Sequence, residues 1–329
     1  KAQNMYLDDM REFLEIKSED KEKTRDIPID SSYEIEFKNV SFKYPKTDKY
    51  IYKNLSLKIK KGQRLAIVGI NGAGKTTTIR QLMGFIRPDK GNVKINGLDC
   101  FDKAEEVQKV LGYLPGEIAF MDDMTGMEFI KFIGNMKGMK DFSSAEELMK
   151  FFELDPSGKI KKMSKGMKQK IGIVCAFMQD PDILILDEPT SGLDPLMQNK
   201  FVELILKERD KGKTILMSSH IFEEIENTCD RVAIIKEGHI IAIENMEKLR
   251  ENKRKIFQVT FNDENEAIKF SEATKKSSRD GNIVDIKVSK NVDEFIKTLS
   301  KYVIKDINIR TQTLEELFLH YYGGEKSDK

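Results

Sequence analysis

Residues 69–76 read Gly69-Ile70-Asn71-Gly72-Ala73-Gly74-Lys75-Thr76 and fit the pattern G-x-x-x-x-G-K-[ST]. The strand candidate Arg64 to Val68 precedes them, and a helical stretch begins near Lys75. Between a strand and a helix, glycines let successive backbone N–H groups curl around phosphate oxygens, and the start of the helix adds positive potential. A glycine-rich turn that carries a lysine by coincidence is the alternative, and the flanking strand and helix argue against it. The pattern therefore predicts a phosphate-binding loop.

This loop supplies candidate contacts to a nucleoside triphosphate and to Mg²⁺. Lys75 is expected to reach the β- and γ-phosphates, and Thr76 to offer its hydroxyl to the metal. The predicted nucleotide-binding residues of this stretch are Gly69, Asn71, Gly72, Ala73, Gly74, Lys75, Thr76 and Thr77.

A second motif is the apolar run Ile183 to Leu186, which ends in Asp187 and Glu188. Such a strand places its two carboxylates at the sheet edge where open α/β folds bind ligands. We expect Asp187 to hold Mg²⁺, usually through water, and Glu188 to act as the general base that polarises the attacking water. Alternatively, one carboxylate merely caps the next turn.

Composition restricts the class of protein. The chain has 329 residues, of which 39% are hydrophobic, so it is long and apolar enough to form a buried core. A formal net charge of +1 provides no general field for nucleic acid or anionic lipid, and no nucleic-acid partner is predicted. The three cysteines show neither disulfide nor zinc-site spacing, which favours a reducing compartment. The longest apolar runs are too short to cross a bilayer, which takes about 20 residues.

Three regions follow one another along the chain. Residues 1–32 are highly charged and predict a short amphipathic helix followed by a linker. Residues 33–245 form the main predicted domain, and residues 246–329 form an appendage. Within the main domain, the alternating segments 34–40 and 55–60 predict an antiparallel β-region.

Beyond the phosphate loop, helical and strand-like stretches alternate to about Ile243, as in an α/β domain with a mostly parallel sheet. Within that domain, segment 118–162 is predicted to be a mostly helical subdomain. The appendage contains three strand candidates, each followed by a helical stretch: 256–261, 283–289 and 303–310. The predicted fold class is therefore α/β, a P-loop NTPase with an antiparallel β-subdomain and a helical subdomain, plus a small C-terminal α+β appendage.

Three short segments carry a family resemblance. Met163-Ser164-Lys165-Gly166-Met167 resembles a degenerate LSGGQ signature, Ser191-Gly192-Leu193-Asp194 resembles a D-loop, and Ser218-Ser219-His220 resembles the switch-histidine segment. Taken alone, Ser164 and Gly166 would suit a helix cap and His220 a surface histidine. In this order within one chain, however, they resemble the nucleotide-binding domains of ABC transporters.

That resemblance implies a head-to-tail homodimer or heterodimer that sandwiches two ATP molecules with Mg²⁺. Each site would combine the phosphate loop, Asp187, Glu188 and His220 of one protomer with Ser164 and Gly166 of the other. The resemblance further assigns Asp194 of the D-loop to the nucleotide site, and Glu188, His220 and Lys75 to catalysis.

Tyr44 matches the aromatic residue that stacks on adenine in this family, although a core tyrosine is the alternative. The chain also departs from the family pattern. Gly116 occupies the position that usually carries the Q-loop glutamine, and we expect Glu117, the next residue, to reach the metal in its place. The signature has Lys165 and Met167 where glycine and glutamine are common.

The two ends of the chain resemble different branches of the family. Residues 36–45 look like the ATPase half of an exporter whose membrane domain precedes it in the same polypeptide. From Thr76 onward, the sequence resembles bacitracin-type drug- or peptide-export ATPases, and residues 313–318 resemble the closing helix of that branch. A mosaic joined near the phosphate loop and divergence within one lineage are both open interpretations.

The predicted function is ATP binding and hydrolysis that powers export of drug, peptide or lipid-like substrates. The partner would be an integral membrane permease, and the protein would lie at the cytoplasmic face of the cell membrane. A DNA-maintenance ATPase of the same family would need a long coiled-coil insertion, which the sequence lacks. A ribosome-binding factor would resemble two such domains, whereas this chain has a single phosphate-loop motif. An uncoupled mosaic that binds ATP without driving transport remains the other alternative.

Overall fold

The computed structural model describes residues 34–70, 72–251, 253, 255–274, 277–288 and 292–322. The predicted N-terminal helix and linker and the candidate residue Asn71 lie outside these residues. The chain divides into two compact units, one ending at Glu244 and one beginning at Asn245. Among the described residues, no helix is both long and apolar enough to span a membrane.

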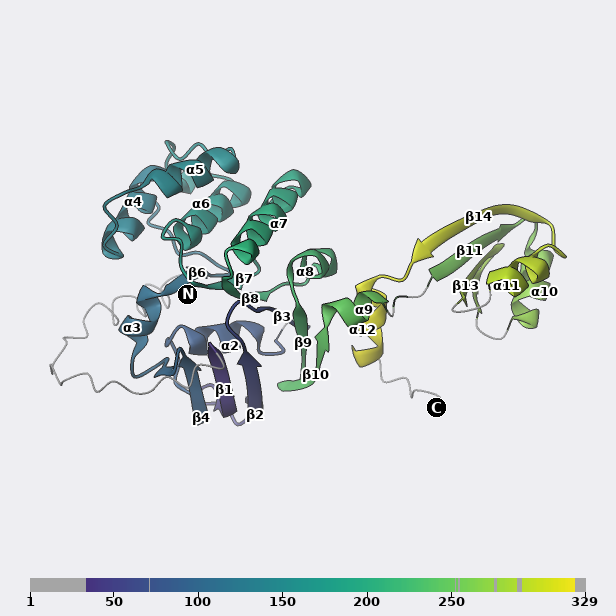
Figure 1. Ribbon diagram of the computed structural model, residues 1–329, viewed down its shortest axis with the longest axis horizontal. Coiled ribbons are helices and arrows are strands. Elements are labelled where there is room, and N and C mark those ends of the chain that lie inside the picture. Colours follow the sequence, from purple (N-terminus) through teal and green to yellow (C-terminus); the bar gives the residue numbers. More distant parts are fainter. Residues whose placement is uncertain are drawn as a thin grey trace. The chain divides into compact units, whose positions relative to one another are not determined.

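A six-stranded sheet forms the centre of the first unit (Figure 1). Its strand order is β10 (His239–Asn245), β9 (Arg231–Lys236), β3 (Arg64–Val68), β8 (Thr214–Ser218), β7 (Ile183–Asp187) and β6 (Leu111–Leu114). The five strands from β9 to β6 run parallel. Every residue of β3, β7 and β8 is buried, as expected for a parallel sheet covered on both faces.

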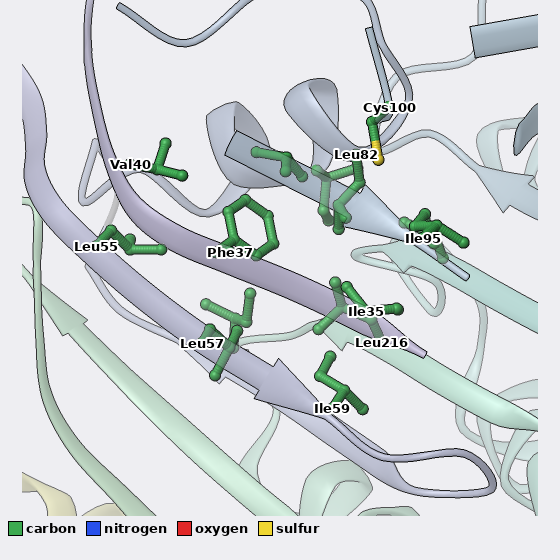
Figure 2. Packing of buried hydrophobic residues seen from close by; sticks show 14 of the residues in the cluster. Ile35, Phe37, Val40, Leu55, Leu57, Ile59, Leu82, Ile95, Cys100 and Leu216 are labelled. Atoms are coloured by element: carbon green, nitrogen blue, oxygen red, sulfur yellow. The ribbon is translucent and has the colours of Figure 1, made fainter. Parts of the chain in front are cut away.

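A four-stranded antiparallel sheet carries much of the core. Its order is β2 (Tyr50–Ile59), β1 (Ile35–Lys43), β4 (Lys90–Ile95) and β5 (Leu98–Asp99). Figure 2 shows inward side chains of this sheet, including Phe37 and its register partner Leu57, together with Leu216 of β8. The helix after the phosphate loop, α2 (Lys75–Leu82), contacts both β4 and β7 and so lies between the two sheets. This packing fixes where the phosphate loop ends.

The remaining helices of this unit lie outside the two sheets, and two of them pack on a third in a mostly helical part. They are α3 (Ala104–Lys109), α4 (Gly126–Met136), α5 (Ser143–Phe151), the short 3₁₀ turn η1 (Ile160–Lys162), α6 (Lys165–Phe177), α7 (Pro195–Asp210) and α8 (Phe222–Thr228). A capping box, in which Thr125 and Glu128 satisfy each other's backbone N–H groups, begins α4. Phe129 and Ile130 of α4 then pack against α6, forming a separate small core.

The second unit contains a four-stranded antiparallel sheet. Its order is β12 (Ser277–Asp280), β13 (Ile283–Val288), β11 (Lys255–Phe261) and β14 (Ile304–Thr311). Its helices are α9 (Met246–Glu251), α10 (Glu264–Ala273), α11 (Val292–Leu299) and α12 (Leu314–Tyr322). Alternate residues of β11, such as Phe257 and Phe261, pack against Phe270 and Phe295 of the helices. The sequence prediction missed β12, because its residues are polar and mostly exposed.

Candidate functional site

The phosphate loop connects β3 to α2, as the sequence predicts. Gly74 takes φ +109° immediately before α2, and a Cβ there would come within 3.2 Å of Ile51 and Tyr52, so both backbone and packing favour glycine. The Nζ atom of Lys75 donates to the carbonyl oxygen of Gly69 at 2.6 Å. The ammonium group therefore lies over the phosphate loop, close to the backbone N–H groups that would bind a phosphate.

Tyr44 and Thr77 meet at the start of α2. The Tyr44 hydroxyl lies 3.3 Å from Thr77 Oγ1, and its ring packs edge-on against Phe42 with centroids 5.1 Å apart. Tyr44 is half-buried. The ring thus borders the core while its polar end faces the phosphate-loop helix, and stacking on adenine stays a prediction.

Asp187 is the buried acidic centre of the site. It ends β7, is 2% exposed, and accepts hydrogen bonds from the hydroxyls of Ser218 and Thr76. Burial raises the pKa of Asp187, and these two hydrogen bonds partly offset that effect. The Thr76 hydroxyl and the Asp187 carboxylate, two of the three predicted metal ligands, are therefore brought together.

Gly116 lies directly beside this carboxylate. A Cβ at position 116 would be 3.2 Å from Asp187 Oδ2, and the backbone of Gly116 does not adopt the left-handed conformation that would demand glycine. Glu117 is exposed, and none of the described residues forms a hydrogen bond or ion pair with it. The position next to the acidic centre is thus Gly116, while Glu117 has no contact that holds it there.

Glu188 and His220 form the second polar pair. His220 Nδ1 lies 2.5 Å from Glu188 Oε2, and the backbone N–H of Glu188 donates to Ser218 O and Oγ, both at 3.1 Å. Glu188 has φ +48°, an uncommon conformation for a residue with a side chain and one that clusters at functional sites. The register of β7 with β8, Asp187 opposite Ser218, brings these sequence-distant groups together.

Ser164, Gly166 and Asp194 form a separate cluster. Ser164 caps α6 by accepting from the N–H of Met167 at 3.2 Å, and Asp194 caps α7 by accepting from Met197 at 3.0 Å. A Cβ on Gly166 would come within 2.8 Å of Gly192 O, so the signature and D-loop segments pack closely. Among the hydrogen bonds of the described residues, none joins this cluster to the phosphate loop.

Comparison with known proteins identifies the family. The ABC transporter sequence profile matches residues 52–191, and the linearmycin resistance ATP-binding protein LnrL of Bacillus subtilis (strain 168) is 31% identical over 312 residues, covering 89% of this chain and 100% of LnrL. The chain belongs to the ABC transporter ATP-binding proteins. The bacitracin transport ATP-binding protein BcrA of Enterococcus faecalis is similar as well, at 29% identity over 89% of this chain and 97% of BcrA.

Solved structures agree with this assignment. An ATP-binding subunit of an ABC transporter aligns with a TM-score of 0.60 and 32% identity, covering 66% of this chain and 92% of that one. A dimeric post-hydrolysis state of the ATP-binding cassette MJ0796 bound to ADP and Pi aligns with a TM-score of 0.59 and 25% identity. The alignment covers 64% of this chain and 98% of the MJ0796 chain. The predicted fold class is confirmed, and membership of the family makes the chain an ATPase. The similarity to bacitracin-type proteins is also confirmed, whereas the mosaic origin stays a prediction.

Two buried residues of this ABC ATPase site were missed in the sequence. Glu224 of α8, 5% exposed, accepts hydrogen bonds at one oxygen, Oε2, from Thr190 at 3.1 Å and Ser219 at 2.7 Å. Burial raises the pKa of Glu224 to about 7. Gln169 of α6 donates to the Pro189 carbonyl at 2.7 Å. The sequence feature that could have pointed to Glu224 is an acidic residue on a helix, four positions after His220.

Proposed function

We propose that this chain is the ATP-hydrolysing subunit of an export or resistance transporter, working as a dimer closed around two ATP molecules. The observation that carries the proposal is the convergence of Lys75, Asp187, Glu188 and His220 at the carboxyl ends of three neighbouring strands, β3, β7 and β8. Ligands bind at that edge of open α/β sheets. Relatives named for linearmycin resistance, bacitracin transport and Nod factor export support the export direction.

Glu188 and His220 suit base-assisted hydrolysis. His220 holds Oε2 of Glu188, so Oε1 is left to accept a proton from a water molecule attacking the γ-phosphate. The left-handed backbone of Glu188, fixed by two hydrogen bonds to Ser218, sets the direction of that carboxylate. Lys75 places a cation beside the phosphates, where it offsets the charge that develops as the terminal phosphate departs.

The residues around Asp187 also fit Mg²⁺. One buried carboxylate and one hydroxyl, from Asp187 and Thr76, are a typical protein share of a Mg²⁺ site completed by substrate phosphates and water. When bound, Mg²⁺ neutralises phosphate charge and orients the phosphates for attack. Gly116 adds no side-chain ligand.

An apolar cavity supports a membrane partner. It has a volume of about 210 Å³ and lies between β6, the segment after it, α4 and α6. Its lining includes Phe85, Tyr113, Ile118, Ile133 and Met136. The segment that carries Gly116 also contributes Pro115 and Ala119 to this lining, so a permease segment seated here would contact the same loop that borders Asp187. We therefore propose that the permease binds at residues 118–162 and that the protein lies at the cytoplasmic face of the membrane.

The decisive variant is Glu188→Gln. We expect it to bind ATP, to hydrolyse it at least about 10²-fold more slowly, and to accumulate as a dimer in gel filtration with ATP, since the closed state would no longer be released. Glu223→Gln, an exposed carboxylate at the start of α8, is the matched control and should behave as the parent. Equal hydrolysis rates for Glu188→Gln and the parent would remove Glu188 from the role of base.

A further inference from the structure

Strand β14 forms an open edge of the second unit. It bonds to β11 on one side, with Ile307 opposite Val259 and Ile309 opposite Phe257, and the described residues place no strand on its other side. Ile307 is 41% exposed and Ile309 is 56% exposed, although both lie on the face where Phe257 and Val259 are buried. An exposed strand edge with apolar side chains is a template for pairing with another strand.

The backbone pattern shows which groups point outward. The N–H of Ile307 donates at 2.9 Å to Oδ1 of Asp306 on its own strand, and therefore does not belong to the ladder with β11. Alternate residues of an antiparallel strand direct their N–H and C=O groups to the same side. Over the regular stretch from Asp306 to Thr311, the outward groups of β14 are consequently those of Ile307, Ile309 and Thr311.

The sequence of this edge is complementary to itself. Residues 306–310 read Asp-Ile-Asn-Ile-Arg. If two copies pair antiparallel about Asn308, Ile307 lies opposite Ile309, and Asp306 lies opposite Arg310, each pair occurring twice. Opposite charges and β-branched residues directly across from each other stabilise strand pairing. The outward N–H and C=O groups of Ile307 and Ile309 then face each other as hydrogen-bonded pairs, as the backbone pattern requires.

Other registers lose this agreement. Centring the pair on Ile307 sets Asp306 against Asn308 and Lys305 against Ile309. A shift of the register by one residue would place side chains from opposite faces of the sheet across from each other. Arg310 already donates to Glu316 at 2.8 Å and Asp285 at 3.2 Å, but its guanidinium has five N–H donors and the side chain is 38% exposed.

We propose that β14 pairs with β14 of a second copy of this chain, forming one continuous antiparallel sheet across a two-fold axis. Charged residues on an edge strand ordinarily disfavour pairing with strands of other proteins. The charges of β14 are complementary to those of an identical strand, so they allow pairing with a second copy. Because the pair is isologous, it is closed and limits the assembly at this edge to two copies.

This pairing has a consequence for the ATPase cycle, which rests on the proposed function. An ATP sandwich opens after hydrolysis, and a second contact between the same two chains would keep the separated domains at a high effective concentration. The β14 pair would then be present without nucleotide, whereas closure of the ATPase domains requires ATP.

Cysteine cross-linking tests the register. In the proposed pair, residue 308 faces its own copy in a non-hydrogen-bonded position, with Cα atoms about 4.5 Å apart, which is within disulfide range. Asn308→Cys should therefore form a covalent dimer under mild oxidation without nucleotide. Lys305→Cys, also exposed on β14, is the control, because its two copies would lie about 20 Å apart. The native cysteines, Cys100, Cys175 and Cys229, are all buried.

A charge variant provides an independent measurement. Asp306→Arg places two arginines against each other at both ends of the pair and should raise the nucleotide-free dimer dissociation constant about tenfold in sedimentation. Cross-linking of Asn308→Cys no stronger than that of Lys305→Cys, or an unchanged dissociation constant for Asp306→Arg, would overturn the pairing. The cross-link is measured without ATP, so failure of Glu188→Gln to form an ATP-bound dimer would refute the proposed hydrolytic role and leave this result unaffected.

Discussion

Glu224 offers the sharpest test of the site's electrostatics. Its carboxylate is buried behind His220 and joins Thr190, three residues after the end of β7, to Ser219, which precedes the histidine. Desolvation is the main cause of its raised pKa, and the nearby charge of Glu188 adds to it. Glu224→Gln replaces the carboxyl by an isosteric neutral group that keeps one acceptor oxygen for both hydroxyls.

The sign and size of the effect follow from the pKa. A folded-state value of about 7, against 4.5 for the free group, means that the folded protein holds the proton more tightly than the unfolded chain. The stabilisation that protonated Glu224 gives the folded state is fully present below pH 4.5 and is lost as the pH rises through about 7. At about 1.4 kcal/mol per pKa unit, the loss approaches about 3 kcal/mol, of which most falls between about pH 5 and about pH 8.

Denaturant unfolding of the parent and of Glu224→Gln across this pH range measures the difference. We expect the free energy of unfolding of the variant, relative to the parent, to increase by about 2 to 3 kcal/mol from the acidic to the alkaline end. Among the described residues, Glu224 Oε1 has no hydrogen-bond partner, so the N–H donor that the amide places there stays unpaired. This costs about 1–3 kcal/mol at every pH and therefore cancels from the slope. Glu223→Gln should show no such slope. Parallel curves for Glu224→Gln and the parent would refute the raised pKa.

Three further variants test the nucleotide and metal contacts. Lys75→Ala removes the cation held against Gly69 O, so ATP affinity and turnover should both fall steeply; unchanged affinity in an equilibrium titration would contradict the phosphate-loop assignment. At the Q-loop position, Gly116→Gln directs a side chain toward Asp187 from a backbone conformation open to any residue, although its Cβ meets Asp187 Oδ2 at 3.2 Å and the carboxylate must shift by a few tenths of an ångström. With that shift, the variant should be neutral or mildly activating in steady-state ATPase assays across a Mg²⁺ titration. In the same assay Glu117→Ala should weaken Mg²⁺-dependent turnover if Glu117 moves to the metal when nucleotide binds. An unaltered Mg²⁺ dependence would end that assignment and agree with the exposed position of Glu117, at which no described residue forms a hydrogen bond or ion pair with it.

Local sequence patterns predicted much of the fold. The strand Arg64 to Val68 has the predicted bounds, because an apolar run before a glycine-rich turn is both the cause and the sign of a buried strand. Ser164 and Asp194 begin helices for an equally local reason, since their side chains reach the N–H three residues later. The polar strand β12 escaped prediction because its pairing with β13, and not its composition, makes it a strand.

The sequence by itself determined the phosphate loop, the acidic strand end and the order of the motifs, since each is a pattern of neighbouring residues with its own short-range geometry. Only the tertiary structure decided which of those motifs touch. The register of β7 with β8 brings His220 to Glu188, folding of α8 brings Glu224 beneath them, and Gly116 rather than Glu117 comes to lie against Asp187. These contacts depend on closing long loops and on packing whole faces of the sheet, and no spacing in a single sequence encodes them directly.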